Sequence, residues 1–155
     1  MRVLLKLVLR CDADAAWRGV TSPAGLQQVS APLMHFDSLE PAGFPETWGA
    51  GEHPVKVSAL GGVVPLGEQV IAIGFPPARA GARLVRDTGY GVSGIFPLVR
   101  RWRHTMAVAP ASASTTLYRD ELSFDAGRLT LAMWPVYWTF WQWRGARLRQ
   151  AARSW

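Results

Sequence analysis

The sequence predicts an α+β protein in which a curved antiparallel sheet packs against one long C-terminal helix. Segments that alternate polar and apolar residues, as half-buried strands do, recur between residues 33 and 124. Two helix-start signals follow the first apolar segment, and beyond residue 127 apolar side chains recur at spacings of three and four. A bent sheet leaves one face to cover. Because only the last helix is long enough to cover it, we expect the two to pack together.

The length and composition suit one domain spanning residues 1–155. The chain is 49% hydrophobic and 18% charged, as in ordinary soluble proteins, and its single cysteine, Cys11, excludes an internal disulfide. The apolar run at the N-terminus is interrupted by Lys6 and is not followed by a good cleavage site, so we interpret it as a strand and not as a signal peptide. A cytoplasmic location is therefore expected.

The chain is expected to begin with one strand and two short helices, at residues 2–9, 13–19 and 23–29. Asp12 and Asp14 are good caps for the first helix, and Ser22 caps the second, in which Pro23 occupies the first turn. Strands are then expected at residues 33–39, 55–60, 68–75 and 82–88. The Pro- and Gly-rich segment 41–54 and the glycine-rich segment 89–94 are interpreted as loops.

Two alternating stretches, 102–106 and 116–122, are expected to form an antiparallel hairpin around the break at residues 110–114. With the turn centred near Ser112, three pairs lie opposite one another on one face: Trp102 with Leu122, His104 with Asp120, and Met106 with Tyr118. The apolar members mark this face as the interior, and Arg103 pairs with Glu121 on the other face. Ionisable groups enter a core only with partners, so the hairpin predicts a polar pair beside a ligand pocket.

The last helix is expected to present one broad apolar face made of two adjoining stripes: Met133, Tyr137, Phe140 and Arg144, and Trp134, Trp138, Trp141 and Leu148. Pro135 fits either the first turn of this helix or a kink inside a longer one.

The net charge of +6 is concentrated at the C-terminal end, where residues 128–155 contain five arginines and no acid. These cations complement the dipole of the last helix. Contact of this basic helix with a membrane is the alternative, whereas a nucleic-acid partner is not expected, because no recognition motif accompanies the charge. The three histidines lack ligand spacing, so no metal is expected, and no other cofactor is expected because the glycine groups match no phosphate-binding pattern. No pattern in the sequence indicates an oligomeric state.

Three segments together resemble the helix-grip fold of the START/Bet v 1 superfamily, specifically the SRPBCC or polyketide cyclase/dehydrase-like group. They are Asp14-Ala-Ala-Trp17 with Thr21-Ser-Pro23, Trp102-Arg-His104 with Thr116-Leu-Tyr118-Arg-Asp120, and Trp143-Arg144-Gly-Ala-Arg147-Leu-Arg149. The resemblance implies a curved antiparallel sheet of about six to seven strands wrapped around the C-terminal helix, with two short helices after the first strand. The superfamily includes lipid and hormone binders, aromatic polyketide cyclases, oxygenase subunits and co-chaperones, so fold does not decide function. The chain has no Rieske or mononuclear-iron ligand pattern.

His104 and Asp120 are the candidate catalytic residues, as a general acid/base pair in which the carboxylate orients the imidazole. They could equally orient a ligand, or only satisfy one another inside the sheet. The candidate ligand-binding residues are Trp102, Met106, Tyr118, Trp134, Tyr137, Trp138, Trp141 and Arg144. The alternative for the aromatic residues is plain core. Arg144 could hold a ligand carboxylate. The alternative for Arg144 is a position at the rim of the cavity or an ion pair with an acid on the sheet.

Three functions remain open from the sequence. The first is binding of a small hydrophobic molecule, aromatic or lipid-like, between the last helix and the sheet. The second is a cyclase/dehydratase-like enzyme that uses His104 and Asp120. The third is an interaction module whose cavity is filled by tryptophans. A void of several hundred cubic ångströms, as ligand pockets have, favours the first two.

Overall fold

An antiparallel sheet of eight strands curves around the long helix α3 (Thr130–Ala151) in this computed structural model, which describes residues 1–155. The chain begins with β1 (Arg2–Leu9), α1 (Ala13–Val20) and α2 (Pro23–Ser30). The remaining strands are β2 (Met34–Ser38), β3 (Gly51–Ala59), β4 (Val64–Gly74), β5 (Arg83–Asp87), β6 (Tyr90–Gly91), β7 (Arg101–Ser112) and β8 (Thr115–Asp125). Short 3-10 turns lie at Phe96–Leu98 and Gly127–Leu129. The strand order is β1-β8-β7-β5-β4-β3-β2, with β6 paired to β4.

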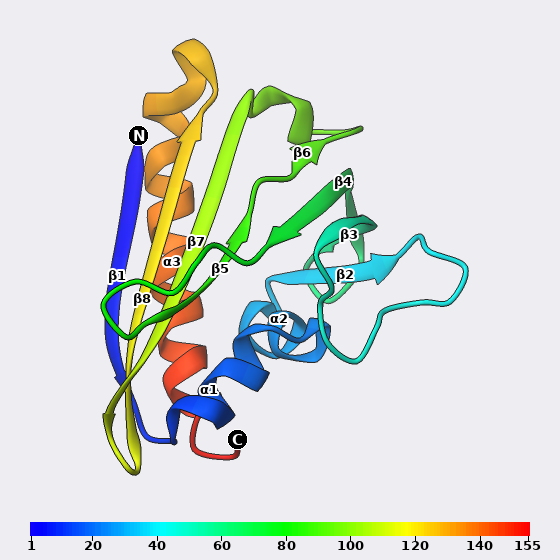
Figure 1. Cartoon of the computed structure of the whole chain (residues 1–155). Helices are drawn as coiled ribbons and strands as arrows, with labels where there is room; N and C mark the ends of the chain where they lie inside the picture. The colour runs from blue at the N-terminus through cyan, green and yellow to red at the C-terminus, as the bar shows by residue number, and fades with distance from the viewer.

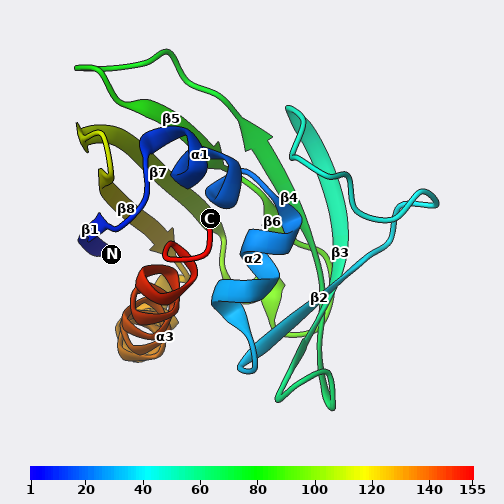
Figure 2. The same ribbon diagram turned by 90° about the horizontal axis from the view of Figure 1, so that it is seen from below.

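All three helices lie on the inner side of the curved sheet, as the view from below shows (Figure 2). In Figure 1, α3 runs behind β1, β8 and β7, and α1 and α2 lie near its C-terminal end. The predicted α+β helix-grip arrangement is confirmed. No helix combines the length and the hydropathy that a transmembrane span requires.

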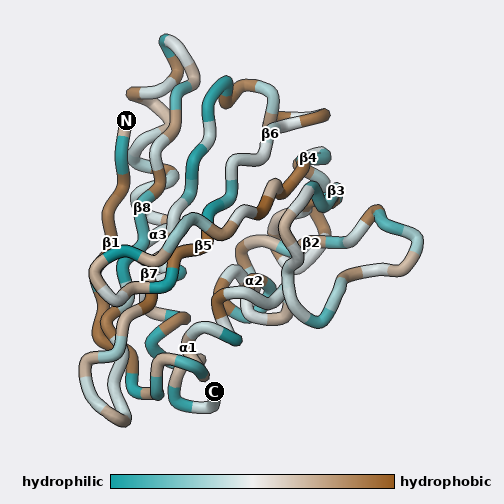
Figure 3. The backbone as a smooth tube through the Cα atoms, viewed as in Figure 1, coloured by the Kyte–Doolittle hydropathy of each residue, from teal (hydrophilic) through white to brown (hydrophobic).

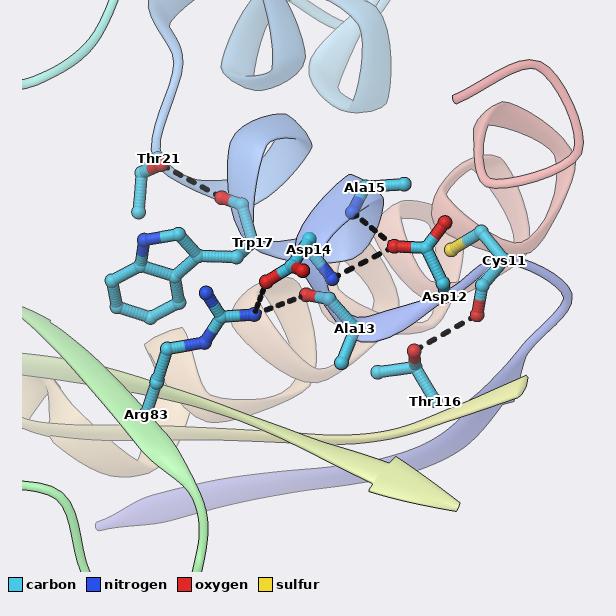
Figure 4. Close-up of polar contacts among 9 residues, drawn as sticks. All are labelled: Cys11, Asp12, Ala13, Asp14, Ala15, Trp17, Thr21, Arg83 and Thr116. Carbon is cyan, nitrogen blue, oxygen red and sulfur yellow. Dashed lines mark hydrogen bonds and ion pairs between the residues drawn. The ribbon is translucent and has the colours of Figure 1, made fainter. Parts of the chain in front are cut away.

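The two short helices begin where the capping residues predict. The Asp12 carboxylate accepts hydrogen bonds from the backbone N–H groups of Asp14 and Ala15 at 2.9 and 2.8 Å (Figure 4). Asp14, the other candidate cap, lies inside the first turn of α1 and forms an ion pair with Arg83 of β5 at 2.9 Å. These contacts fix α1 against the sheet and so fix one end of the space enclosed by the helices.

The sheet has one strand more than the resemblance implied, and two predicted strand boundaries were wrong. β3 begins at Gly51, inside the segment interpreted as a loop, and β4 begins at Val64 and continues through Gly67. A Cβ at Gly67 would lie 2.3 Å from the carbonyl oxygen of Ser93, so the absent side chain allows segment 89–94 to pack against β4. Part of that segment, also interpreted as a loop, pairs with β4 as β6.

The hairpin of β7 and β8 forms as predicted, but its register differs by two residues. Trp102 lies opposite Phe124, His104 opposite Leu122, Met106 opposite Asp120, Val108 opposite Tyr118, and Arg103 opposite Ser123. The reason is that the strands extend to Ser112 and Thr115, with an irregularity between Pro110 and Ser112. Because a shift by two keeps every side chain on its face, the predicted interior set still points inward.

The core lies between the inner face of the sheet and α3. Trp141 and Leu148 of α3 are buried, and a Cβ at Gly145 would lie 2.8 Å from the Leu5 side chain, so α3 packs closely on β1. The hydrophobic colour is strongest along β1 and around β4 (Figure 3). Pro135 is inside α3, which corresponds to the second of its two predicted placements.

Candidate functional site

A cavity of about 140 Å³ lies between the inner face of the sheet and the helices, and most of its lining is hydrophobic. α1, α2 and α3 all contribute to the lining, together with β2 and the strands from β4 to β8. Of the predicted site residues it contacts Trp102, His104, Met106, Tyr118, Tyr137, Trp141 and Arg144. The structure therefore brings seven of these ten side chains around one space.

Asp120 lies behind the cavity wall and accepts hydrogen bonds from three side chains. The His104 Nε2 and the Trp141 Nε1 lie 2.8 Å from its Oδ1, and the Tyr118 hydroxyl donates to its Oδ2 at 2.8 Å. All four residues are buried. The arrangement, called the Asp120 cluster below, joins β7, β8 and α3 and is a fully connected polar network inside the core.

The charge on Asp120 is stabilised by these partners. Burial raises the pKa of the carboxyl, but the His104 imidazole, the Arg144 guanidinium and the Trp141 N–H outweigh burial and hold the pKa below its ordinary value. Burial and then the neighbouring Asp120 charge raise the pKa of Tyr118 well above its usual range, although Arg144 opposes this. Asp120 is thus an ionised acceptor and Tyr118 a neutral donor at ordinary pH.

His104 has one ring nitrogen fixed and the other free. Because the ionised Asp120 can only accept, the imidazole Nε2 carries a proton in this hydrogen bond. Its Nδ1 makes no hydrogen bond, and in the neutral ring this atom is an acceptor. The ring packs against two indoles that also contact each other, with centroid distances of 6.5 Å to Trp102 and 5.2 Å to Trp141. The arrangement holds the imidazole in one orientation at the cavity wall.

Trp102 is held in place by Asp87, a residue that the sequence analysis missed. The Trp102 Nε1 donates to the Asp87 Oδ2 at 2.9 Å, while the Asp87 Oδ1 accepts from the backbone N–H groups of Ala72 and Gly89 at 2.9 and 2.8 Å. The bond to Gly89 forms an Asx-type turn, for which the sequence Asp-Thr-Gly was a local signal. Asp87 therefore accepts three hydrogen bonds that fix Trp102 and the turn after β5.

Arg144 contributes a cation to the lining and is not paired with an acid. It makes no hydrogen bond and no ion pair within 4.0 Å, and its Nε is buried without a partner. Its guanidinium carbon lies 4.9 Å from the centre of the Trp141 ring, a cation–π arrangement. The predicted alternative of an ion pair with the sheet is therefore wrong.

Two other cavity residues carry polar groups without partners. The Ser30 hydroxyl at the end of α2 is fully buried and makes no hydrogen bond. Tyr137 also makes no side-chain hydrogen bond, and burial raises the pKa of its phenol to about 12, so it stays neutral. Ser30 and the apolar wall residue Trp48 were not among the predicted site residues, because their positions depend on how α2 and segment 41–50 pack against the sheet.

Trp134 and Trp138 lie outside the cavity lining. Their rings stack on one another at 6.4 Å, and the Trp134 Nε1 donates to the Arg2 carbonyl at 3.1 Å. His53 bonds to Glu40 at 2.9 Å and is also absent from the lining. No group of three or more His, Cys, Asp or Glu side chains is placed to hold a metal ion.

Solved structures share this fold, although no protein-family model and no curated protein matches the sequence. An aromatase/cyclase from Streptomyces sp. R1128 is 15% identical over 99% of this chain and 93% of its own, with a TM-score of 0.66. Norcoclaurine synthase from Thalictrum flavum, in complex with dopamine and hydroxybenzaldehyde, is 12% identical over 99% of this chain and 87% of its own, with a TM-score of 0.66.

A di-domain aromatase/cyclase is 20% identical over 97% of this chain and 45% of its own, with a TM-score of 0.62. At such identities the similarity is informative about the arrangement of strands and helices. The protein therefore has the helix-grip fold of these aromatase/cyclases and of norcoclaurine synthase.

Proposed function

We propose that this protein binds a small hydrophobic molecule, of the size of one aromatic ring, in the cavity between α3 and the sheet. The observation that carries the proposal is the apolar cavity itself, with indole and phenol rings in its wall. A void of about 150 Å³ lined by apolar side chains accommodates benzene, so a cavity of about 140 Å³ suits a single ring. The volume favours this ligand over the polycyclic or lipid-like ligands that the sequence also allowed, since drug-sized ligands occupy about 300 Å³ or more.

The ligands named for one structural neighbour support this size class. Norcoclaurine synthase is described in complex with dopamine and hydroxybenzaldehyde, which are both one-ring aromatic compounds. The walls of the present cavity suit such rings, because Trp102, Tyr137 and Trp141 lie with their centroids 5.7 to 6.2 Å apart and at steep angles to one another.

Binding is tested with neutral one-ring probes and a variant that fills the cavity. We expect toluene and phenylacetamide to cause saturable amide shifts in ¹H–¹⁵N NMR spectra, confined to residues around the cavity. Val99→Trp places a larger side chain in the lining and should abolish the shifts, whereas Val92→Trp, at an exposed position outside the lining, should leave them. Absence of saturable shifts in the wild type, or full retention in Val99→Trp, would contradict the proposal.

Acid–base catalysis is the second candidate function, and one observation favours it. The His104 imidazole is oriented by an ionised carboxylate while its Nδ1 stays free in the cavity lining, which is the arrangement of a general base. In this role the Nδ1 would take a proton from a carbon next to a carbonyl and later return it. Asp120 would position the ring and stabilise the imidazolium.

Catalysis is tested by deuterium exchange at the carbon next to the carbonyl of phenylacetone in D₂O. We expect the wild type to accelerate exchange and His104→Gln, whose amide can still donate to Asp120, to lose the acceleration. His35→Gln is the matched control, because His35 is exposed and outside the lining. Equal exchange rates for His104→Gln and the wild type would leave His104 with a structural role only.

A further inference from the structure

We infer that the cavity selects aromatic molecules that carry a carboxylate and that Arg144 binds this group. The inference rests on the proposed binding function and names the chemical class of the ligand. It starts from the one charged side chain in the cavity lining that has no partner in the protein.

Arg144 makes no ion pair within 4.0 Å in the protein, and Asp120 and Asp87 already accept hydrogen bonds from other groups. Asp120 accepts from His104, Tyr118 and Trp141, and Asp87 accepts from Trp102 and two backbone N–H groups. The guanidinium has five N–H donors, and a cation in a mainly apolar wall is costly unless it is paired. An anionic group on a ligand would supply the missing acceptor.

The position of the guanidinium suits a carboxylate. Its stacking on the Trp141 indole, at 4.9 Å, restricts the orientation of the planar fork before any ligand arrives. A fork held in this way can donate two parallel hydrogen bonds to a carboxylate, and such bonds are stronger than neutral ones. A neutral carbonyl would use this geometry less completely.

The two turns of α3 before Arg144 indicate where the aromatic part of the ligand lies. Phe140 and Tyr137 lie four and seven residues before Arg144 and also line the cavity. Side chains at this spacing share one face of a helix, with about 5.4 Å between turns. One aromatic ring against Phe140 and Tyr137 therefore brings a carboxylate attached directly, or through one methylene, to Arg144.

Ser30 offers a second free donor in the same lining. Its buried hydroxyl makes no hydrogen bond, and α2 packs against α3. With Tyr137, three polar side chains of one largely apolar cavity make no hydrogen bond, which is unusual because buried polar groups are nearly always satisfied. All three can donate to a ligand with acceptor atoms.

The test compares phenylacetate with phenylacetamide, which has the same ring and nearly the same shape but no charge. We expect the wild type to bind phenylacetate about tenfold or more tightly by calorimetry or NMR titration, a difference of about 1.4 kcal/mol. Arg144→Met should lose that preference and keep the affinity for the amide. Arg149→Met, an exposed cation further along α3, is the matched control and should bind both compounds like the wild type.

Each outcome has one meaning. Equal affinity of the wild type for the two compounds, or unchanged phenylacetate affinity in Arg144→Met, would overturn the role of Arg144 while the cavity remains a binding site. Failure of the wild type to bind either compound would overturn the proposed function together with this inference. If Arg144→Met did not fold, the comparison of the two compounds on the wild type would still decide.

Discussion

Asp120 and Arg144 are two charges that contact different parts of the same tryptophan, and they have opposite surroundings. The Trp141 N–H donates to Asp120, whereas the Trp141 ring lies under the Arg144 guanidinium. Asp120 accepts three side-chain hydrogen bonds, while Arg144 makes none. A satisfied buried charge is costly to disturb, and an unsatisfied one is available to a ligand. In our proposal, Asp120 stabilises the fold and Arg144 selects the ligand.

His104 combines a hydrogen-bonded nitrogen, as in the Asp120 cluster, with an unpaired nitrogen, as in Arg144. Its Nε2 is part of the satisfied network and its Nδ1 is not. One ring can therefore stabilise the hairpin and still present a free acceptor at the cavity wall. This explains why loss of stability and loss of function have to be measured separately for variants of this residue.

Removing the Asp120 carboxylate should have the largest effect on stability. Asp120→Ala leaves the His104, Trp141 and Tyr118 donors without an acceptor in the core, and breaking a buried pair in this way costs about 3 to 5 kcal/mol. We expect a loss of this size in the free energy of unfolding from urea denaturation. The control is Glu121→Ala, the next residue on the outer face of β8, whose ion pair with Arg2 at 3.7 Å is exposed and should matter little. A cost below about 1 kcal/mol for Asp120→Ala would contradict the idea that the cluster stabilises the fold.

Removing only the Tyr118 hydroxyl should have an intermediate effect. Tyr118→Phe keeps the ring and deletes one hydrogen bond to a charged acceptor, which is worth about 1.5 to 3 kcal/mol. The variant should also change the pH profile. Because the folded pKa of Tyr118 is raised, its contribution is fully present below the unfolded value of about 10 and is lost as the pH rises above it.

The measurement is the free energy of unfolding at a series of alkaline pH values. The wild type should lose stability more steeply than Tyr118→Phe above about pH 10, by up to 1.4 kcal/mol for each pH unit. Tyr137, whose pKa is raised to about 12, contributes a similar slope to both proteins and so cancels in the comparison. Parallel profiles would show that Tyr118 ionises as easily in the folded protein as in the unfolded chain.

Acid should reduce the difference in the free energy of unfolding between the wild type and Asp120→Asn, a variant without the carboxylate charge. The folded pKa of Asp120 is lowered, so its contribution is present above the unfolded value of about 3.9 and is lost as the pH falls through the folded value. The stability advantage of the wild type over Asp120→Asn should therefore shrink between about pH 5 and pH 2.5, by roughly 1 to 2 kcal/mol. A constant difference across this range would mean that the charge on Asp120 contributes nothing.

The alternation of residues was enough to predict which side chains of the hairpin share the inner face, although not which residues lie opposite one another. A register error of two residues leaves every side chain on its face, so His104, Tyr118 and Asp120 were correctly placed inside. The same error hid the fact that His104 reaches Asp120 diagonally. The irregularity between Pro110 and Ser112, which sets the register, has no signal in the alternation itself.

The contribution of α3 was harder to predict because its apolar face is broad. Trp138 and Trp141 are only three residues apart, yet Trp141 is buried in the Asp120 cluster and Trp138 is 45% exposed. Local spacing does not define the rotation of a helix about its axis when eight residues share the apolar face. That Arg144 is unpaired follows only from the tertiary structure, in which Asp120 and Asp87 already have partners.

Replacing Arg144 should have the smallest effect on stability, which is the sharpest contrast with Asp120. Arg144→Met removes a guanidinium without partners and keeps an unbranched apolar chain over the Trp141 ring. The variant loses the electrostatic attraction between Arg144 and Asp120, which costs stability. It also removes a buried Nε that has no hydrogen-bond partner, which restores stability. We expect the free energy of unfolding to change by less than about 1 kcal/mol in either direction, measured by urea denaturation beside Asp120→Ala. A loss as large as that of Asp120→Ala would show that the two charges form one structural unit, and the division between a structural charge and a ligand-binding charge would then fail.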